Sequence, residues 1–322
     1  MAAKLEVASF ACLDSIQMKR GIYLVANQKS QNMCENLVYS IRESGCELPI
    51  RLIHFGGKKV SSSYLHNQVE FLSYERFPEE AKAFIINLSS VLTDCPIGFL
   101  YRYLAWFSDW DEFIYADNDI VALCNWENLF SYLDQNELVH ADEEYTTNGA
   151  YNYNDSESVK AIFGQFALES AITAGHIVVK RNPKMIVDIN NAVDWFKRHP
   201  DIPKKHDQSL LHIAALLGNW KSLNLCKPPY NWLSSWAGDY KNSLQLIQSI
   251  QLKNARISHI HYSGGAPRGN LPIQDLLFSA DSAEGRLVKL ASVGLRFLSK
   301  YEALSCQYAK AKRFLSRRLI KK

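Results

Sequence analysis

Two acidic side chains follow a run of apolar residues in the middle of the chain, with one residue between them. The run Phe113 to Val121 is typical of a β-strand, and it contains Asp117 and Asp119. In an extended segment, residues i and i+2 point to the same side, so both carboxylates can reach one cation. Carboxylate oxygens are ligands that Mg²⁺ and Mn²⁺ prefer. The pair therefore predicts a metal site that holds a diphosphate.

The same spacing of aspartates occurs a second time, at Asp109 and Asp111. This earlier pair follows a helix-like run, which favours a helix end or a turn, whereas the later pair follows apolar strand residues. Short motifs of this kind also occur by chance. A solvated turn is therefore the alternative interpretation of Asp117 and Asp119.

A second group of candidate ligands lies far along the chain. His259 and His261 are two residues apart in an apolar segment, so they share one face of a predicted strand. Gly264 and Gly265 follow and allow backbone to approach a ligand closely. One imidazole added to two carboxylates suits Mn²⁺ or Mg²⁺ better than zinc, although a single histidine is more often structural. Arg268 can neutralise a phosphate oxygen.

The elements that position these groups alternate between strands and helices. The segment 21–27, a helix over 30–44 and the strand 50–55 form a βαβ unit, which predicts a parallel sheet. No G-x-G-x-x-G follows the first strand, so a dinucleotide-type phosphate loop is not expected. The other expected strands are 69–72, 113–121, 138–141, 172–179 and 256–262. The other expected helices are 79–88, 97–108, 125–133, 185–197 and 207–217.

Composition and charge set the class of protein. The chain has 322 residues, 47% of them hydrophobic, which is enough for one large α/β domain with additions. Its seven cysteines form no C-x-x-C pair, so we expect reduced thiols without a zinc cage. No apolar run approaches the roughly 20 residues of a membrane span, and no secretory signal is evident, so we expect a cytoplasmic protein.

The net charge of +3 conceals a strongly basic end. Residues 286–322 hold eleven basic side chains and one acidic one, so residues 1–285 are acidic overall. On a helix, the leucines and aromatic residues of 287–319 form one stripe opposite most of the lysines and arginines. Such a segment can bind an anionic membrane surface at the inner face of the membrane. A helix packed on its own domain is the alternative, and a nucleic-acid partner is unlikely.

Four pieces of the sequence carry a family resemblance. They are Arg102, the run from Phe113 to Phe130, the segment His206 to Leu211, and the segment Ile260 to Gly264. In this order they resemble glycosyltransferase family eight, which includes glycogenin and the lipopolysaccharide galactosyltransferases. By architecture the resemblance spans about residues 21 to 269. It implies an α/β fold of GT-A type, a Rossmann-like nucleotide-diphospho-sugar transferase domain over 1–280, followed by the basic amphipathic tail 281–322.

The resemblance also implies roles for individual residues. Asp117, Asp119 and His261 match the family's metal ligands, and Arg102 matches a basic residue that contacts the donor. Asp207 and Gln208 match the pair beside the transferred sugar. The strand end at Ala26 and Asn27 matches the place that receives the nucleobase. The implied cofactor is Mn²⁺ or Mg²⁺ with a UDP-sugar as donor.

The sequence departs from the family pattern in two places. The family has Lys-Pro-Trp after the metal histidine, where this chain has Pro267 and Arg268, so Arg268 is the candidate substitute cation. The family has Asn-Ser-Gly ahead of its middle strand, where this chain has Thr173 to Gly175. Both departures leave the donor sugar weakly constrained.

The expected function is a metal-dependent glycosyltransferase of hexosyltransferase type. It would move a sugar from a nucleotide diphosphate to a glycan or lipid-linked acceptor, as in lipopolysaccharide or polysaccharide biosynthesis. The resemblance implies retention; with inversion, Asp207 becomes the candidate base. As the N-cap of helix 207–217, Asp207 would instead be structural. A sugar nucleotidyltransferase and a non-catalytic carbohydrate-binding protein are alternatives; the first usually has a Gly-rich loop that residues 26–30 lack.

Overall fold

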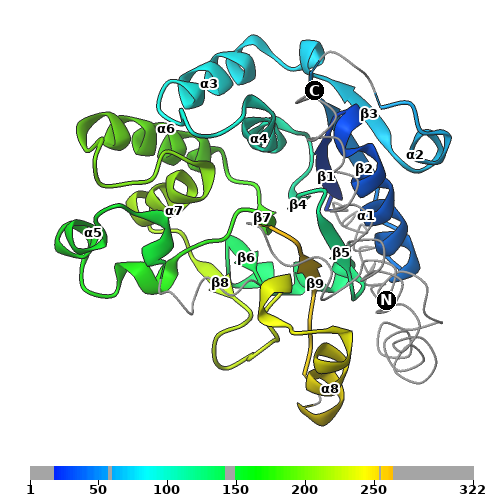
Figure 1. Ribbon diagram of the computed structural model, residues 1–322. Coiled ribbons are helices and arrows are strands. Elements are labelled where there is room, and N and C mark those ends of the chain that lie inside the picture. The colour runs from blue at the N-terminus through cyan, green and yellow to red at the C-terminus, as the bar shows by residue number, and fades with distance from the viewer. Residues whose placement is uncertain (1–17, 57–59, 142–148, 254, 264–322) are drawn as a thin grey trace, which may run out of the picture.

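The strand-forming segments assemble into one central sheet with a short ribbon beside it (Figure 1). The computed structural model describes residues 18–56, 60–141, 149–253 and 255–263. The seven-stranded sheet has the order β3-β2-β1-β4-β7-β6-β8, and β5 pairs with β9 in the ribbon. The strands are β1 (Arg20–Ala26), β2 (Ile50–His54), β3 (Glu70–Ser73), β4 (Glu112–Ala116), β5 (Ile120–Ala122), β6 (Leu138–His140), β7 (His176–Lys180), β8 (Ser222–Asn224) and β9 (His259–His261).

The first half of the sheet is parallel, as the βαβ pattern predicts. Strand β1 pairs in parallel with both β2 and β4, and β2 pairs in parallel with β3. Beyond β4 the sheet is mixed, because β7 runs antiparallel to β4 and to β6, while β6 and β8 are parallel. This reversal brings the start of β7, at His176, opposite Ala116 at the end of β4. Residues just before β7 therefore lie next to those just after β4.

The described helices cover both faces of the sheet (Figure 1). Their bounds are α1 (Gln31–Glu43), α2 (Ser63–Gln68), α3 (Glu79–Ser89), α4 (Ile97–Leu100), α5 (Ser156–Phe163), α6 (Pro183–Arg198), α7 (Asp207–Gly218) and α8 (Ser243–Lys253). Two longer 3₁₀ segments flank the motif strand in sequence: η3 (Tyr101–Phe107) and η4 (Trp126–Asp134).

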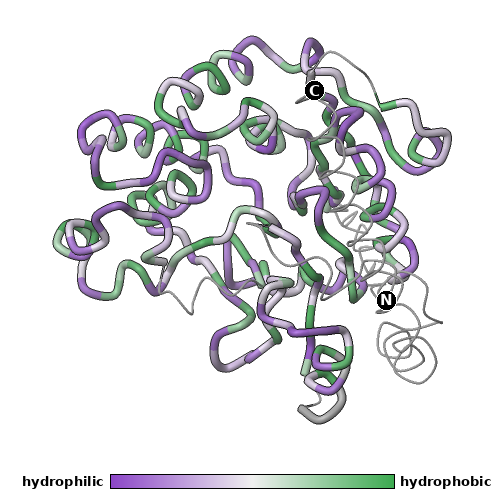
Figure 2. Tube along the Cα trace, viewed as in Figure 1, coloured by the Kyte–Doolittle hydropathy of each residue, from purple (hydrophilic) through white to green (hydrophobic). Residues whose placement is uncertain are grey.

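Successive side chains of the central strands point to opposite faces of the sheet, so the core has two layers. In β1, Ile22 and Leu24 pack with α1 and η4, while Tyr23 and Val25 pack with α3, α6 and α7. All four side chains are buried because this strand lies between the two helical layers. Burial on both faces explains why the central strands are largely hydrophobic in Figure 2, where the chain is coloured by hydropathy.

Several elements differ from the sequence-based expectation. The segment 113–121 is not one strand, because β4 ends at Ala116 and β5 begins at Ile120. The expected helix 97–108 is one α-helical turn followed by the 3₁₀ segment η3, and 125–133 is also 3₁₀. Helices α2, α5 and α8 and strand β8 were not expected. They are short or weakly periodic, so local pattern does not single them out.

The five cysteines that the structure describes are free thiols, as expected. They are Cys34, Cys46, Cys95, Cys124 and Cys226. Burial raises the pKa of Cys34 to about 12, which keeps its thiol protonated. Cys34, Cys46 and Cys226 are buried and serve as small core side chains, whereas Cys95 and Cys124 are partly exposed.

Gly21 tests the packing of the parallel half of the sheet. A Cβ atom there would lie 2.3 Å from the Trp110 ring, which is held between Tyr23, at a centroid distance of 4.6 Å, and the guanidinium of Arg51. We expect Gly21→Ala to lower the free energy of unfolding by about 1–3 kcal/mol, since the ring has no free space to move into. Urea denaturation measures this change. Ile86→Ala, at a side chain that is 66% exposed, is the control and should change it little; equal midpoints for both variants would contradict this account.

Candidate active site

The two aspartates of the central motif lie in a turn between β4 and β5. The expectation that an extended pleat aligns them is wrong, because the chain turns at residues 117–119. The turn is fixed by two hydrogen bonds: Asp117 N donates to Gly175 O at 2.7 Å, and Asn118 Nδ2 donates to Val25 O at 2.6 Å. These bonds attach the turn to the segment before β7 and to the end of β1. Both carboxylates therefore sit at the carboxyl edge of the parallel strands, where such sheets bind ligands.

His261 reaches this turn through the two-stranded ribbon. Strand β9 pairs antiparallel with β5, with Ile120 opposite His261, so the imidazole lies beside the turn that precedes β5. Its Nε2 is 3.4 Å from Asp119 Oδ1 and 3.9 Å from Asp117 Oδ2. One ligand atom from each of the three residues lies within 4.8 Å of the others. The structure thus brings together the three side chains that the sequence names as metal ligands.

A glycine leaves the space that the His261 ring occupies. A Cβ atom at Gly175 would lie 2.1 Å from Cε1 of His261. The backbone of Gly175 also accepts the hydrogen bond from Asp117 N. Gly175 therefore leaves room for the His261 ring and also accepts the hydrogen bond from Asp117. Only a residue without a side chain allows the ring to approach the backbone this closely.

Arg102, in η3, is buried between two carboxylates. Its side chain is 3% exposed; Nη2 lies 3.0 Å from Asp117 Oδ1, and Nη1 lies 2.8 Å from Asp207 Oδ2. The contact with Asp207 is electrostatic and lacks hydrogen-bond geometry, and Nη1 donates to Ala174 O at 2.6 Å. Nε donates to Phe99 O at 3.0 Å. In this structure the guanidinium is thus directed at protein groups, and its contact with a donor stays a prediction.

Charge and burial act in opposite directions on Asp117. Burial raises the pKa of its carboxyl above the ordinary value, while the charge of Arg102 and that of His261 lower it. The side chain keeps 24% of its surface exposed, so solvent moderates the effect of burial. Arg102 and the Tyr115 hydroxyl, which donates at 2.6 Å, both meet Oδ1 of Asp117. Its Oδ2 also accepts from Arg102 Nη2, at the longer distance of 3.4 Å, and lies 3.9 Å from Nε2 of His261.

Asp207 and Gln208 begin helix α7 beside the same backbone segment. The interpretation of Asp207 as N-cap is wrong: His206 is the N-cap, and Asp207 is the first helical residue. Gln208 Oε1 accepts from Ala174 N at 3.3 Å, and its Nε2 donates to Asn152 Oδ1 at 3.0 Å. Ala174 therefore bonds to Arg102 through its carbonyl and to Gln208 through its amide.

The other predicted site residues divide into two sets. Ala26 and Asn27 end β1, and the Asn27 side chain accepts from the amides of Lys29 and Ser30. Because Asn118 bonds to Val25, this strand end lies against the aspartate turn. Three predicted residues, Gly264, Gly265 and Arg268, lie outside the described residues, as do the segments 264–280 and 281–322.

His259 shares its strand face with His261 but has a structural environment. It is fully buried, its Nδ1 lies 2.6 Å from the Ser258 hydroxyl, and its ring lies 4.3 Å from that of His176. Burial lowers its pKa well below the ordinary value, so the ring is neutral. It packs behind the ligand candidate His261, at a ring distance of 6.4 Å.

Sequence reasoning missed the residues that hold the site in place. Tyr115, Ala174 and Asn152 bond to predicted site residues, and Asn118 bonds to Val25 beside them, but the sequence assigned none of the four a role. The available signals were that Tyr115 and Asn118 lie within the run 113–130 and that Ala174 lies within the Thr173 to Gly175 triplet. Positioning groups of this kind depend on long-range contacts that one sequence does not display.

Solved structures identify the class of fold. The apo form of mouse xyloside xylosyltransferase 1 aligns with a TM-score of 0.51 and 11% identity, covering 77% of this chain and 99% of that chain. The galactosyltransferase LgtC, in complex with donor and acceptor sugar analogs, aligns with a TM-score of 0.48 and 14% identity, covering 86% and 98%. The alignment with the xylosyltransferase shows that the fold is that of a GT-A glycosyltransferase.

A family comparison is more specific. The family described as "Mannosyltransferase putative" matches residues 19–184, more than half of the chain. The chain belongs to this family, and it is a glycosyltransferase of hexosyltransferase type. No curated protein matches the sequence. None of the helices in the described part of the chain is long and apolar enough to span a bilayer.

Arg102 gives a direct test of how the site is held. Arg102→Met removes the positive charge that faces Asp117 and Asp207 and leaves two carboxylates at a poorly solvated position. We expect the free energy of unfolding to fall by about 3–5 kcal/mol, as for other buried ion pairs that lose one partner. Urea denaturation measures the loss.

The matched control is a surface ion pair. Lys82 pairs with Glu79 at 2.7 Å on α3, where the glutamate is 89% exposed. Lys82→Met should cost less than about 1 kcal/mol, because solvent screens such pairs. Comparable losses in the two variants would show that Arg102 is an ordinary surface cation and that its burial between the carboxylates is unimportant.

Proposed function

We propose that the protein transfers a hexose from a nucleotide-diphosphate donor, in a reaction that depends on Mn²⁺ or Mg²⁺. One observation carries the proposal: Asp117, Asp119 and His261 converge at the carboxyl edge of the sheet, and Arg102 joins this group to Asp207. Ligand candidates and a sugar-side carboxylate thus form one polar site in a GT-A fold.

The residues present suit a divalent cation. Two carboxylates and one imidazole match the preference of Mn²⁺ and Mg²⁺ for oxygen with limited nitrogen ligation. Asp117 accepts from Tyr115 on Oδ1 and from Arg102 on both oxygens, at 3.0 Å on Oδ1 and 3.4 Å on Oδ2, and these bonds orient it as a ligand with Oδ2 on the side of His261. A bound cation would supply positive charge against the diphosphate that leaves the sugar.

The chain's own groups have distinct tasks. Arg102 acts as a positioning residue, since it fixes the separation of Asp117 and Asp207. Asp207 faces the transferred sugar; its charge is already partnered by Arg102, which favours electrostatic stabilisation of a positively charged sugar centre over proton abstraction. This supports retention of configuration. Arg268 is proposed to neutralise the leaving phosphate, and Gln208 to orient the sugar.

The proposed donor is a nucleotide sugar whose sugar and nucleotide are each supported by a different observation. The family description favours mannose as the transferred sugar, and the resemblance to family eight favours UDP as the nucleotide. Ala26 and Asn27 are proposed to receive the nucleobase, because the end of β1 adjoins the aspartate turn. The proposed acceptor is a glycan or a lipid-linked glycan, as in lipopolysaccharide or polysaccharide biosynthesis.

The domain division and the location of the protein are part of the same proposal. Residues 1–280 form the catalytic domain, and 281–322 form a basic tail that binds an anionic membrane surface. A lipid-linked acceptor fits this arrangement, because the tail would hold the enzyme at the cytoplasmic face where the acceptor lies. The charge of residues 286–322 supports it.

The ion site is tested by removing one ligand. Asp119→Ala should reduce sugar transfer or hydrolysis of the nucleotide sugar, in the presence of Mn²⁺, by at least about 100-fold, since the charge facing the diphosphate is lost. Release of the nucleoside diphosphate from a panel of UDP-sugars and GDP-mannose measures this. The same panel identifies the donor.

The chain offers a control with the same motif spacing. Asp111, in the pair Asp109 and Asp111, accepts from the Lys19 amide at 2.9 Å and lies outside the site. Asp111→Asn should leave nucleotide release unchanged. Full activity in Asp119→Ala would refute the ion site, and equal losses in both variants would point to a general loss of folding.

A substitution at Gly175 would change the geometry of the ion site and leave its charges unchanged. Gly175→Ala places a methyl group against the His261 ring and should displace it without altering any charge. We expect the apparent affinity for Mn²⁺ to fall by about 10- to 100-fold, as when other supports of metal ligands are lost. Mn²⁺ titration of the activity, or of the protein by electron paramagnetic resonance, measures the shift; unchanged affinity would show that His261 does not bind the ion.

A further inference from the structure

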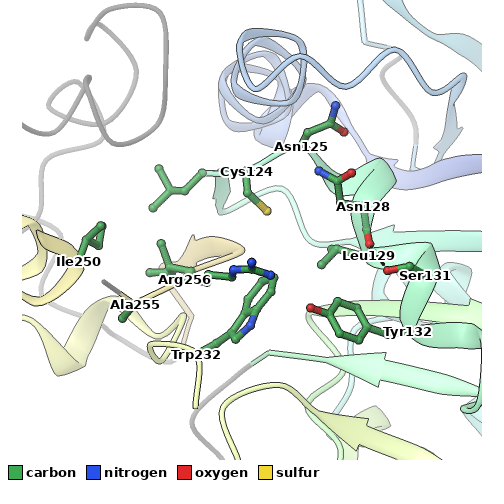
Figure 3. A pocket seen from close by; sticks show the side chains of 12 residues that line it. Cys124, Asn125, Asn128, Leu129, Ser131, Tyr132, Trp232, Ile250, Ala255 and Arg256 are labelled. Atoms are coloured by element: carbon green, nitrogen blue, oxygen red, sulfur yellow. Dashed lines mark hydrogen bonds between the residues drawn. The ribbon is translucent and has the colours of Figure 1, made fainter. Parts of the chain in front are cut away.

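A second polar cavity lies at the other end of the β5–β9 ribbon. It has a volume of about 430 Å³, within the range of small-molecule sites. Its walls come from the residues after β5, from η4, from the loop around Trp232 and from the segment before β9 (Figure 3). The segments are far apart in sequence, so the fold creates the cavity.

This cavity is separate from the ion site. In the ribbon, Ile120 faces His261 at the end nearest the aspartates, and Ala122 faces His259 at the other end. The cavity begins beyond Ala122, at Leu123, and is roughly 10 Å along the ribbon from the ion ligands at a strand rise of about 3.3 Å per residue. None of the ion-site residues lines it.

Four polar groups line the cavity without a partner among the described residues. They are the guanidinium of Arg256, Nε1 of Trp232, the hydroxyl of Tyr132 and the side-chain amide of Asn128; no hydrogen bond or ion pair joins these groups to the described residues. Figure 3 shows Arg256 and Trp232 on one side and Asn128 and Tyr132 on the other, with the Tyr132 hydroxyl turned toward Trp232.

Trp232 is the most informative of the four. Its side chain is 9% exposed, and its ring packs at 6.1 Å from Tyr132, edge to face. A tryptophan that is buried to this extent usually gives its N–H a partner. Here the N–H has no acceptor among the described residues and Trp232 lines the cavity, where an oxygen of a ligand can accept it.

The charge of the cavity is positive. No carboxylate occurs among the described residues that line it, and Arg256 has no acidic partner among them. An unpaired guanidinium with neutral donors around it favours a ligand that bears one anionic group. The floor is apolar, with Leu129 and Ile257, and so accepts the C–H face of a small ring.

We propose that this cavity binds a sugar that carries one phosphate or carboxylate. Arg256 binds the anion, Asn128 and Tyr132 bond to hydroxyl groups, and the Trp232 N–H donates to a ring or anionic oxygen. The site is distinct from the donor site and does not require that the chain transfers a sugar. It would let the protein recognise a glycan that is already charged.

The test uses mannose 6-phosphate as probe in the Asp119→Ala background, so that the ion site does not bind its phosphate. Titration is followed by ³¹P NMR line width and by calorimetry without divalent ions. We expect saturable binding that Arg256→Gln weakens about tenfold or more, because a charge-assisted hydrogen bond is lost. Trp232→Phe keeps the ring, removes the N–H, and should weaken binding about threefold or more.

Controls distinguish the outcomes. Arg198→Gln removes an exposed arginine at the end of α6 and should leave binding unchanged. Uncharged mannose should bind at least about tenfold more weakly than mannose 6-phosphate. Absence of saturable binding, or equal affinity in Arg256→Gln and the parent, overturns the site. Equal affinity for inorganic phosphate and mannose 6-phosphate overturns recognition of a sugar.

Discussion

The structure depends on one buried guanidinium, that of Arg102, which lies between two carboxylates. A guanidinium that is 3% exposed is costly to remove from water unless anions and carbonyls surround it. Arg102 meets Asp117 and Asp207 as well as the carbonyls of Phe99 and Ala174. These groups come from four parts of the chain, so each must reach its native position before the charge is satisfied. The same contacts set the spacing between the proposed ion ligands and the proposed sugar-side carboxylate, which makes one interaction responsible for both stability and site geometry.

The segment 173–175 completes this arrangement through its backbone alone. The carbonyl of Ala174 accepts from Arg102, its amide donates to Gln208, and the carbonyl of Gly175 accepts from Asp117. Backbone groups impose little demand on side-chain identity, except where the His261 ring requires a glycine. This explains why Thr173 and Ala174 can differ from the family pattern while Gly175 agrees with it. The antiparallel entry of β7 makes these contacts possible, since it places the start of that strand beside the end of β4.

Local sequence pattern was sufficient for the elements that carry strong periodicity. The first strand and its helix, and the helices found as α3, α6 and α7, lie within a few residues of their expected bounds. The turn at 117–119 was only the alternative interpretation of Asp117 and Asp119, because apolar residues continue on both sides of it and resemble one strand. The direction of β7 and the burial of Arg102 depend on contacts between residues 60 to 105 positions apart, which no local window contains. The grouping of Asp117, Asp119 and His261 was predicted from order along the chain; their geometry required the structure.

The family match and the site do not cover the same part of the chain. Residues 19–184 include Arg102, the two aspartates of the turn and the 173–175 segment, but neither Asp207 nor His261. Those two side chains come from α7 and β9, which follow the matched region. Because Arg102 has its second carboxylate only when α7 docks, and the aspartate turn has its imidazole only when β9 pairs with β5, the matched region alone leaves the site incomplete. The later segments also supply Trp232 and Arg256 of the second cavity. The part of the chain beyond the family match therefore completes both the candidate active site and the second cavity.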